Sequence, residues 1–133
     1  MIHDQDSSTF VDELLLKELE QKTGRSNRQE DEIHLTWVEG GEVLGGLYAF
    51  CRFETCFLDL LAVDPSARSR KVGSQLMHKM ESLCREKGLK YILLNTQDYQ
   101  APEFYRKLGY EETAAVKDVP FEGTPRYYFK KRL

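Results

Sequence analysis

The sequence contains no long hydrophobic run. Its nearest approach, Val43–Cys51, is interrupted by two glycines and falls well short of the roughly 20 apolar residues that a membrane-spanning helix needs. The first ten residues also lack the basic start and apolar core of a signal peptide, so we expect no export. Both absences predict a cytoplasmic protein without a membrane partner.

Cysteine is scarce as well, with three residues in the chain: Cys51, Cys56 and Cys84. An odd number at irregular spacing gives no disulfide framework and favours a reducing compartment. No cluster of His, Cys and carboxylate residues has metal-ligand spacing, so we expect no metal cofactor. The phosphate-binding motif GxxxxGK[ST] and the dinucleotide motif GxGxxG are also missing.

The sequence also lacks an excess of positive charge. The net charge of −3 and the pI of about 5.7 disfavour broad electrostatic binding to nucleic acid, so we expect no such partner. The chain is 41% hydrophobic and 31% charged, which indicates an ordered globular protein rather than a disordered one. Its 133 residues predict a single domain that covers residues 1–133.

The apolar residues follow a helical spacing in some segments and alternate in others. The expected elements are a helix over Thr9–Lys22, strands over Ile33–Trp37, Val43–Phe53 and Phe57–Val63, a helix over Val72–Lys87, a strand over Tyr91–Leu94, a short helix from Pro102 that ends before Gly109, and strands over Tyr110–Val119 and Arg126–Lys131. Three successive strands without a helix between them imply antiparallel pairing, whereas the later strand–helix–strand unit implies one parallel crossover. The pattern therefore predicts an α/β fold with a mixed, mostly antiparallel sheet.

One segment stands out for its chemistry, the run LLAVDPSARSRKVGSQLM at Leu60–Met77. It leads from an apolar strand through a basic loop into a helix, where unpaired backbone N–H groups favour an anion. The residues Arg68, Arg70 and Lys71 add positive charge, and Gly73 allows a ligand to approach the backbone closely. This pattern favours a pyrophosphate site, although three basic residues alone are also typical of a solvated loop.

The same segment resembles the acetyl-CoA-binding motif of the GNAT N-acetyltransferase superfamily, whose core is Arg/Gln-x-x-Gly-x-Gly/Ala. Arg68, Val72, Gly73 and Ser74 match that motif in order, but Lys71 stands where the first glycine would be. The resemblance implies a GNAT-type fold with helices on both faces of the sheet, and acetyl-CoA as cosubstrate. The residues implied to hold its pyrophosphate are Arg68, Ser69, Arg70, Lys71, Val72, Gly73 and Ser74.

A second segment, Leu94–Glu112, resembles a later motif of the same family, in which a strand leads to Ala-x-x-Phe-Tyr-x-x-x-Gly-Phe/Tyr. The matching residues are Ala101, Phe104, Tyr105, Gly109 and Tyr110. The asparagine often found three residues before that alanine is an aspartate here, so its CoA contact is not carried over. Two motifs in the right order, about 30 residues apart as in the family, make the resemblance specific.

The resemblance implies that acetyl-CoA lies between two strands that splay apart beside a bulge. Here these would be Leu58–Val63 and Tyr91–Asn95, with Asn95 among the cofactor-binding residues. The backbone of Leu61, Ala62 and Val63 would pair with the pantetheine arm like an added strand, and a backbone N–H at the bulge would polarise the thioester.

Tyr105 is the implied general acid for the departing thiolate, because a phenol stays protonated at neutral pH. The base is open. Strand alternation puts Asp59 on the same sheet face as Leu61, where it could accept the amine proton, orient a cationic acceptor or simply pair with a lysine or arginine. Glu54 and His34 are alternatives, and an amine that arrives neutral needs no dedicated base.

We therefore expect direct transfer of an acetyl group from acetyl-CoA to a primary amine, since no nucleophile is placed for a covalent intermediate. One alternative is a non-catalytic CoA-binding sensor or interaction module of the same fold, which Lys71 in the glycine position favours. Another is a purely structural α/β interaction domain. The acceptor, a small molecule or a protein amine, is not specified by the sequence, and a homodimer is an option from the family alone.

Overall fold

The computed structural model describes all 133 residues. The chain forms six strands, three α-helices and two short 3-10 helices, connected by turns and loops. In chain order these are α1 (Ser8–Thr23), β1 (Asp31–Glu39), β2 (Glu42–Arg52), β3 (Thr55–Val63), η1 (Pro65–Arg70), α2 (Val72–Glu86), β4 (Tyr91–Gln97), η2 (Asp98–Gln100), α3 (Pro102–Lys107), β5 (Glu111–Val116) and β6 (Arg126–Arg132). The expected order of helices and strands is confirmed. None of the helices combines the length and the apolar character needed to cross a membrane.

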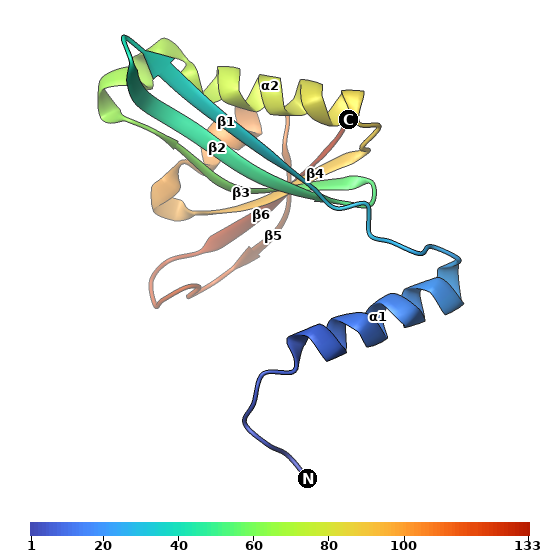
Figure 1. Ribbon diagram of the computed structural model, residues 1–133. Coiled ribbons are helices and arrows are strands. Elements are labelled where there is room, and N and C mark those ends of the chain that lie inside the picture. Colours follow the sequence, from blue (N-terminus) through green and yellow to red (C-terminus); the bar gives the residue numbers. More distant parts are fainter.

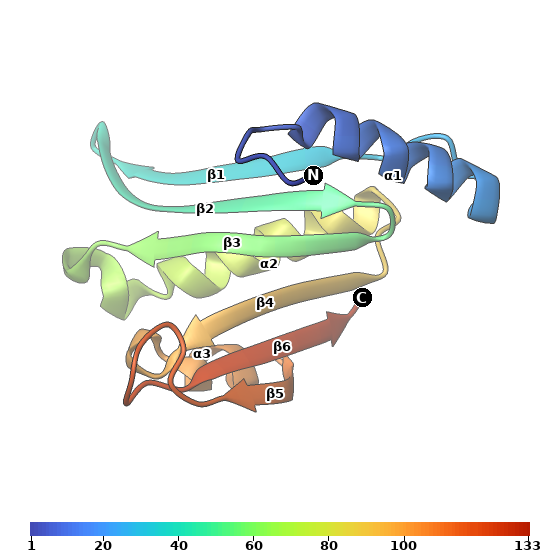
Figure 2. The same ribbon diagram turned by 90° about the horizontal axis from the view of Figure 1, so that it is seen from below.

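The six strands form one sheet in the order β1-β2-β3-β4-β6-β5 (Figure 2). All neighbours pair antiparallel except β3 and β4, which pair parallel and are connected through α2. The mixed sheet and its single parallel crossover are therefore as predicted. The tight turn between β1 and β2 uses Gly40 and Gly41, both at positive φ (54° and 78°), as a two-residue hairpin requires.

The helices α2 and α3 lie against the same face of the sheet, where the core is (Figure 2). The fully buried Met77 and Met80 of α2 pack with Ile92 of β4 and Phe129 of β6 in one cluster. The first helix, α1, lies on the other side of the sheet from α2, and none of its residues is buried (Figure 1). Its start is capped by Ser7 without a side-chain bond, and Gly24 ends it at a φ of 78°.

Two strands are longer than expected. β1 begins at Asp31, two residues before the expected start at Ile33, because the backbone of Asp31 pairs with Cys51 whatever its side chain is. β4 extends to Gln97 because β6 pairs with it as far as Arg126. β5 is shorter than expected and ends at Val116. Backbone pairing with a distant strand, which no local pattern reports, sets these ends.

The register between β2 and β3 shifts at one point. Tyr48 pairs with Leu60 and Ala49 pairs with Leu58, so Asp59 is an extra residue without a partner on β2. This is a β-bulge, which bends a strand and resets the alternation of its side chains.

The parallel pairing of β3 with β4 is short. It spans Thr55–Phe57 against Tyr91–Leu93, and beyond these residues the two strands diverge. The bulge at Asp59 lies just past the last pair. The splayed strands are thus Leu58–Val63, as expected, and the later part of β4 from Leu94 rather than the whole of Tyr91–Asn95.

Candidate active site

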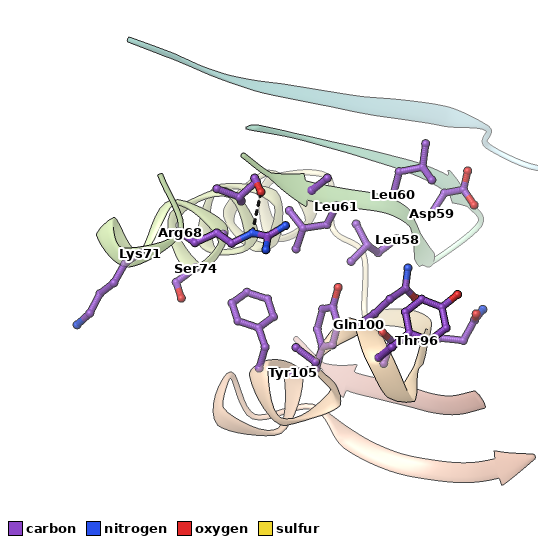
Figure 3. A pocket seen from close by; sticks show the side chains of 17 residues that line it. Leu58, Asp59, Leu60, Leu61, Arg68, Lys71, Ser74, Thr96, Gln100 and Tyr105 are labelled. Carbon is purple, nitrogen blue, oxygen red and sulfur yellow. Dashed lines mark hydrogen bonds between the residues drawn. The ribbon is translucent and has the colours of Figure 1, made fainter. Parts of the chain in front are cut away.

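A cleft of about 680 Å³ opens where β3 and β4 diverge (Figure 3). Strand β3 forms one wall, the start of α2 closes one end, and the end of β4 with η2 and α3 forms the other wall. Its lining residues are Leu58, Asp59, Leu60, Leu61, Ala62, Val63, Arg68, Lys71, Gly73, Ser74, Asn95, Thr96, Tyr99, Gln100, Ala101, Phe104 and Tyr105.

Tyr105 is directed from α3 across the cleft toward β3 (Figure 3). Its ring is held by edge-on contacts with Phe104 and Tyr110, at centroid distances of 5.1 and 6.0 Å, and by Phe129 at 6.1 Å. Burial alone raises the pKa of the Tyr105 phenol to about 12, and no hydrogen bond within the protein contributes to the shift. The site therefore presents a fixed, protonated donor whose hydroxyl is free to serve a ligand.

Gly73 packs closely against Phe104 of α3. A Cβ at this position would lie 3.3 Å from Cζ of Phe104, closer than most such contacts in proteins. The ring of Phe104 therefore rests on the first turn of α2 and joins α3 to it. A Cβ at Gly73 would require this ring to shift by a few tenths of an ångström at the end of the cleft.

The start of α2 is formed by Lys71, which adopts the left-handed conformation at φ 58° and ψ 30°. This backbone geometry suits the glycine of the family motif, so the lysine substitution costs conformational energy but leaves the turn intact. Its side chain points outward from the cleft (Figure 3). The first helical hydrogen bond runs from the Gln75 N–H to the Lys71 carbonyl, so the N–H groups of Val72, Gly73 and Ser74 remain available to an anion.

The basic residues of the loop separate in space. Arg68 reaches into the cleft and donates from Nε to the Val63 carbonyl at 3.1 Å, which leaves its terminal N–H groups free (Figure 3). Arg70 turns away and forms an ion pair with Glu39 at the end of β1. Of the other residues expected here, Val72 is fully buried in the core and Ser69 does not line the cleft.

The free edge of β3 offers backbone groups to the cleft. The Asp64 N–H donates to the Leu44 carbonyl on β2 at 2.8 Å, and backbone groups alternate between the two edges of a strand. Leu61 and Val63 therefore direct their N–H and C=O groups into the cleft, whereas those of Ala62 pair with β2. The expectation that all three residues offer backbone groups to the cleft is wrong for Ala62.

The placement of Asp59 also differs from the expectation. Because the bulge interrupts the alternation, Asp59 does not share the core-side face of Leu61, and it lies toward Tyr48 on the other face. It lines the edge of the cleft with its carboxylate directed away from the centre (Figure 3). No lysine or arginine pairs with Asp59, so its charge is uncompensated by the protein.

The two other candidates for a base lie outside the cleft. Glu54 pairs with Lys90 at 3.2 Å, at the opposite end of β3, and His34 stacks on Tyr48 on the surface of the sheet. No three or more His, Cys, Asp or Glu side chains are close enough together to hold a metal ion. Asn95 lines the cleft as expected.

Two lining residues had no signal in the sequence. Tyr99 and Gln100 lie in η2 and reach the cleft because β4 delivers this turn beside α3. Tyr99 also stacks on Phe121 of the β5–β6 loop, with 6.5 Å between ring centroids. These residues flank the mouth of the cleft and depend on loop packing, which local periodicity does not report.

The arrangement defines a class of enzyme. A helix start and Arg68 can hold a pyrophosphate, the free edge of β3 can pair with an extended amide chain, and Tyr105 can protonate a leaving group. Residues 1–110 match the acetyltransferase (GNAT) family, and the chain belongs to that family. It is an N-acetyltransferase that uses acetyl-CoA as cosubstrate.

The chain is also similar to particular proteins. It is 37% identical over 92 residues to the blasticidin-S acetyltransferase of Streptomyces morookaense, a stretch that covers 67% of this chain and 68% of that relative. The crystal structure of an acetyltransferase from Bacillus cereus ATCC 14579 aligns with 100% of this chain and 97% of its own, with a TM-score of 0.90 and 32% identity. An aminoglycoside 6'-N-acetyltransferase from Enterococcus faecium shares the fold, with a TM-score of 0.69 and 21% identity over 99% and 97% of the two chains.

Proposed function

We propose that Tyr105 is the general acid of acetyl transfer and that the acceptor is a small, cationic primary amine. The observation that carries the proposal is the Tyr105 phenol, which faces the cleft, has no partner in the protein and has a pKa raised to about 12. A group with this pKa is protonated at neutral pH and can give its proton to a thiolate as the sulfur leaves.

In the proposed step, the amine nitrogen attacks the thioester carbon. A C–N bond forms, the C–S bond breaks, and the sulfur leaves as the CoA thiol with the proton of Tyr105. The proton lost by the amine passes to water or to Asp59, and Tyr105 regains a proton from solvent. The N–H of Leu61, directed into the cleft, would stabilise the negative charge that develops on the thioester oxygen.

The cosubstrate would be held by backbone groups more than by side chains. The pyrophosphate would meet the N–H groups of Gly73 and Ser74 with Arg68 beside them, and the pantetheine arm would pair with the carbonyl of Leu61 and the N–H of Val63. The Val63 carbonyl already accepts from Arg68, so it orients that guanidinium instead. Lys71 would contribute positive charge from the surface.

We assign the edge of the cleft at Asp59 to the acceptor amine and call it the acceptor side. This edge favours a cation. Asp59 lies at this edge without an ion-pair partner, and Tyr99 adds an exposed ring. A relative that is 37% identical is named for blasticidin S, which makes this antibiotic the first acceptor to test. We place the reaction in the cytoplasm, because the three cysteines are free and buried, as is usual in a reducing compartment.

A thiol-release assay with acetyl-CoA tests both parts. The amine panel comprises blasticidin S, an aminoglycoside with a 6'-amine, a polyamine, an amino acid and a lysine peptide. We expect release with at least one of the small cationic amines, and release with the peptide alone would overturn the proposed acceptor class.

The same assay tests the acid with Tyr105→Phe, which keeps the ring packing. We expect kcat to fall by about 100-fold or more while KM for acetyl-CoA changes less than about twofold. Tyr127→Phe, whose ring lies under Arg106 outside the cleft, is the matched control. Unchanged turnover in Tyr105→Phe would sink the general-acid assignment.

A further inference from the structure

Helix α1 presents an apolar stripe that nothing in the chain covers. Phe10, Val11, Leu14 and Leu15 are between 46% and 62% exposed, and no residue of the helix is buried. The four residues recur at a spacing that places them on one side of the helix. A 16-residue helix with such a stripe in water is typical of an element that packs against another surface.

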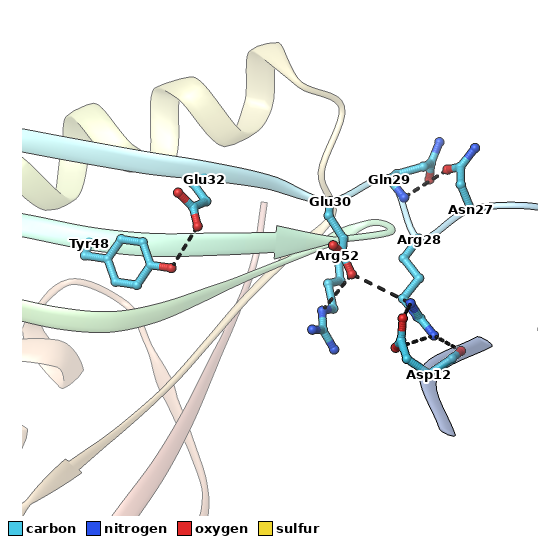
Figure 4. A network of polar contacts seen from close by, with 8 residues as sticks. All are labelled: Asp12, Asn27, Arg28, Gln29, Glu30, Glu32, Tyr48 and Arg52. Carbon is cyan, nitrogen blue, oxygen red and sulfur yellow. Dashed lines mark hydrogen bonds and ion pairs between the residues drawn. The ribbon is translucent and has the colours of Figure 1, made fainter. Parts of the chain in front are cut away.

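The connection to β1 holds α1 away from its own sheet (Figures 1 and 4). The Arg28 guanidinium pairs with the Asp12 carboxylate at 3.0 Å, and the Arg28 carbonyl accepts the Phe53 N–H at 2.7 Å. The helix is therefore tied to the β2–β3 turn, beside the edge of the sheet. The alignment with the Bacillus cereus structure spans 100% of this chain, so it includes α1.

The sheet face opposite α2 carries a second uncovered apolar surface, which we name the aromatic face: His34, Tyr48, Phe50 and Phe57, with Leu93 beside them. The His34 and Tyr48 rings stack at 4.8 Å, and the Phe50 and Phe57 rings at 5.1 Å. These side chains belong to β1, β2 and β3. In the view onto this side of the sheet, α1 lies along the β1 edge and no helix crosses β2 or β3 (Figure 2).

We propose that α1 of one molecule packs on the aromatic face of a second copy of this chain, and that the second copy returns the same contact. The chain holds both halves of the interface, and its own connection keeps them apart. Reciprocal docking forms a closed twofold dimer in which every apolar stripe and every aromatic face is covered. The covered face adjoins Leu60 and Asp59, so each exchanged helix would border the acceptor side of the other copy's cleft.

The dimensions of the two surfaces match. A helix of 16 residues is about 24 Å long, and strands of 9 to 11 residues are about 30 to 36 Å long, so the helix fits within the length of the strands. A stable protein interface usually buries about 1,600 Å² in total, so each of the two helix–sheet contacts would need to bury about half of that area.

The charges of the two surfaces are complementary as well. Helix α1 carries four carboxylates and two lysines. On the sheet, Lys131 faces α2 through its contact with Glu81, so its neighbours Lys130 and Arg132 are on the opposite face. Arg132 lies over the Tyr91 ring at 4.9 Å on that face. An acidic helix would therefore meet these basic residues at the border of the aromatic face, while the Glu32 carboxylate on that face is already engaged by His34 and Tyr48.

Sedimentation of the full chain over a range of concentrations tests the proposal. We expect the wild type at twice the chain mass of 15.5 kDa. Leu15→Glu on the stripe and Phe50→Glu on the aromatic face should each raise the dimer dissociation constant by at least about 100-fold. Glu20→Lys, on the other side of α1, is the matched control and should remain dimeric.

Circular dichroism checks that each variant is folded. Leu15 is exposed, so its substitution leaves the core intact, and His34→Glu replaces Phe50→Glu if that variant does not fold. A monomeric wild type would overturn the proposal and indicate that α1 folds back or serves another partner. A dimer that survives Leu15→Glu, or one that survives the substitutions on the aromatic face, would overturn it too, because the contact would then lie elsewhere.

Discussion

The phenol of Tyr110 donates a 2.8 Å hydrogen bond to Oε2 of Glu81, a carboxylate that is 2% exposed. Lys131 of β6 lies 3.1 Å from the same oxygen and also donates to the carbonyl of Leu108 at 2.7 Å. These contacts join α2 and β6 to the end of α3, the helix that carries Tyr105. Burial and the neighbouring Glu81 carboxylate raise the pKa of Tyr110, so this phenol remains a donor.

This network predicts a large loss of stability when one partner is removed. Glu81→Gln leaves Lys131 without its countercharge in a mostly buried site, and we expect it to lower the free energy of unfolding by about 3 kcal/mol. Tyr110→Phe removes one hydrogen bond to a charged group and should cost about 2 kcal/mol. Urea denaturation measures both, with the exposed Glu86→Gln on the same helix as control. A loss below about 1 kcal/mol for Glu81→Gln would contradict this reading.

The raised pKa of Tyr105 predicts a specific alkaline behaviour. Tyrosine in the unfolded chain titrates near 10 and Tyr105 in the folded protein at about 12, so the unfolded chain loses its proton first. The stability from this phenol is complete below pH 10 and disappears between pH 10 and 12. Relative to Tyr105→Phe, the wild type should lose about 2–3 kcal/mol across that range in denaturation experiments. Parallel curves for the two proteins would show that the phenol is not desolvated.

Two variants of Lys71 separate the effect of its backbone strain on stability from the effect of its charge on acetyl-CoA binding. Lys71→Ala removes the charge and keeps a side chain at φ 58°, whereas Lys71→Gly removes both the charge and the strain. We expect Lys71→Gly to be more stable than Lys71→Ala by about 1 kcal/mol, because glycine adopts this conformation freely. Both variants should raise KM for acetyl-CoA to a similar extent, and the difference from wild type should shrink at high salt. Equal stability of the two variants would show that the left-handed turn carries no penalty.

Asp59→Asn tests whether the Asp59 carboxylate, which lies at the β-bulge, takes part in proton transfer. If Asp59 takes the amine proton, kcat/KM for the amine should fall at neutral pH and recover at alkaline pH, where the free amine is already neutral. A role in binding the cation alone would raise KM for the amine and leave kcat unchanged. Steady-state rates between pH 6 and 10 distinguish the two, and unchanged parameters at every pH would remove Asp59 from the site. Glu54→Gln, at the opposite end of β3, is the control.

The order of the elements, the parallel crossover through α2 and the two motifs that contain Gly73 and Tyr105 could be predicted from the amino-acid sequence alone. These features are local, since helical spacing, strand alternation and turn residues act over a few neighbours. The tertiary structure decided the rest. The bulge at Asp59 depends on the register with β2, and an ion pair with Glu39, 31 residues away, takes Arg70 out of the cleft.

The same distinction applies to the two terminal segments of the chain. Lys131 ends the strand that the sequence predicts over Arg126–Lys131, and Glu81, 50 residues away, holds it in a buried network. The apolar spacing predicts a helix over Thr9–Lys22 but not its partner. The tie from Arg28 to the β2–β3 turn leaves the apolar stripe of this helix without a partner in its own chain. Side-chain alternation and charge determine which environment each residue favours. Contacts between distant segments decide whether the residue is placed in that environment.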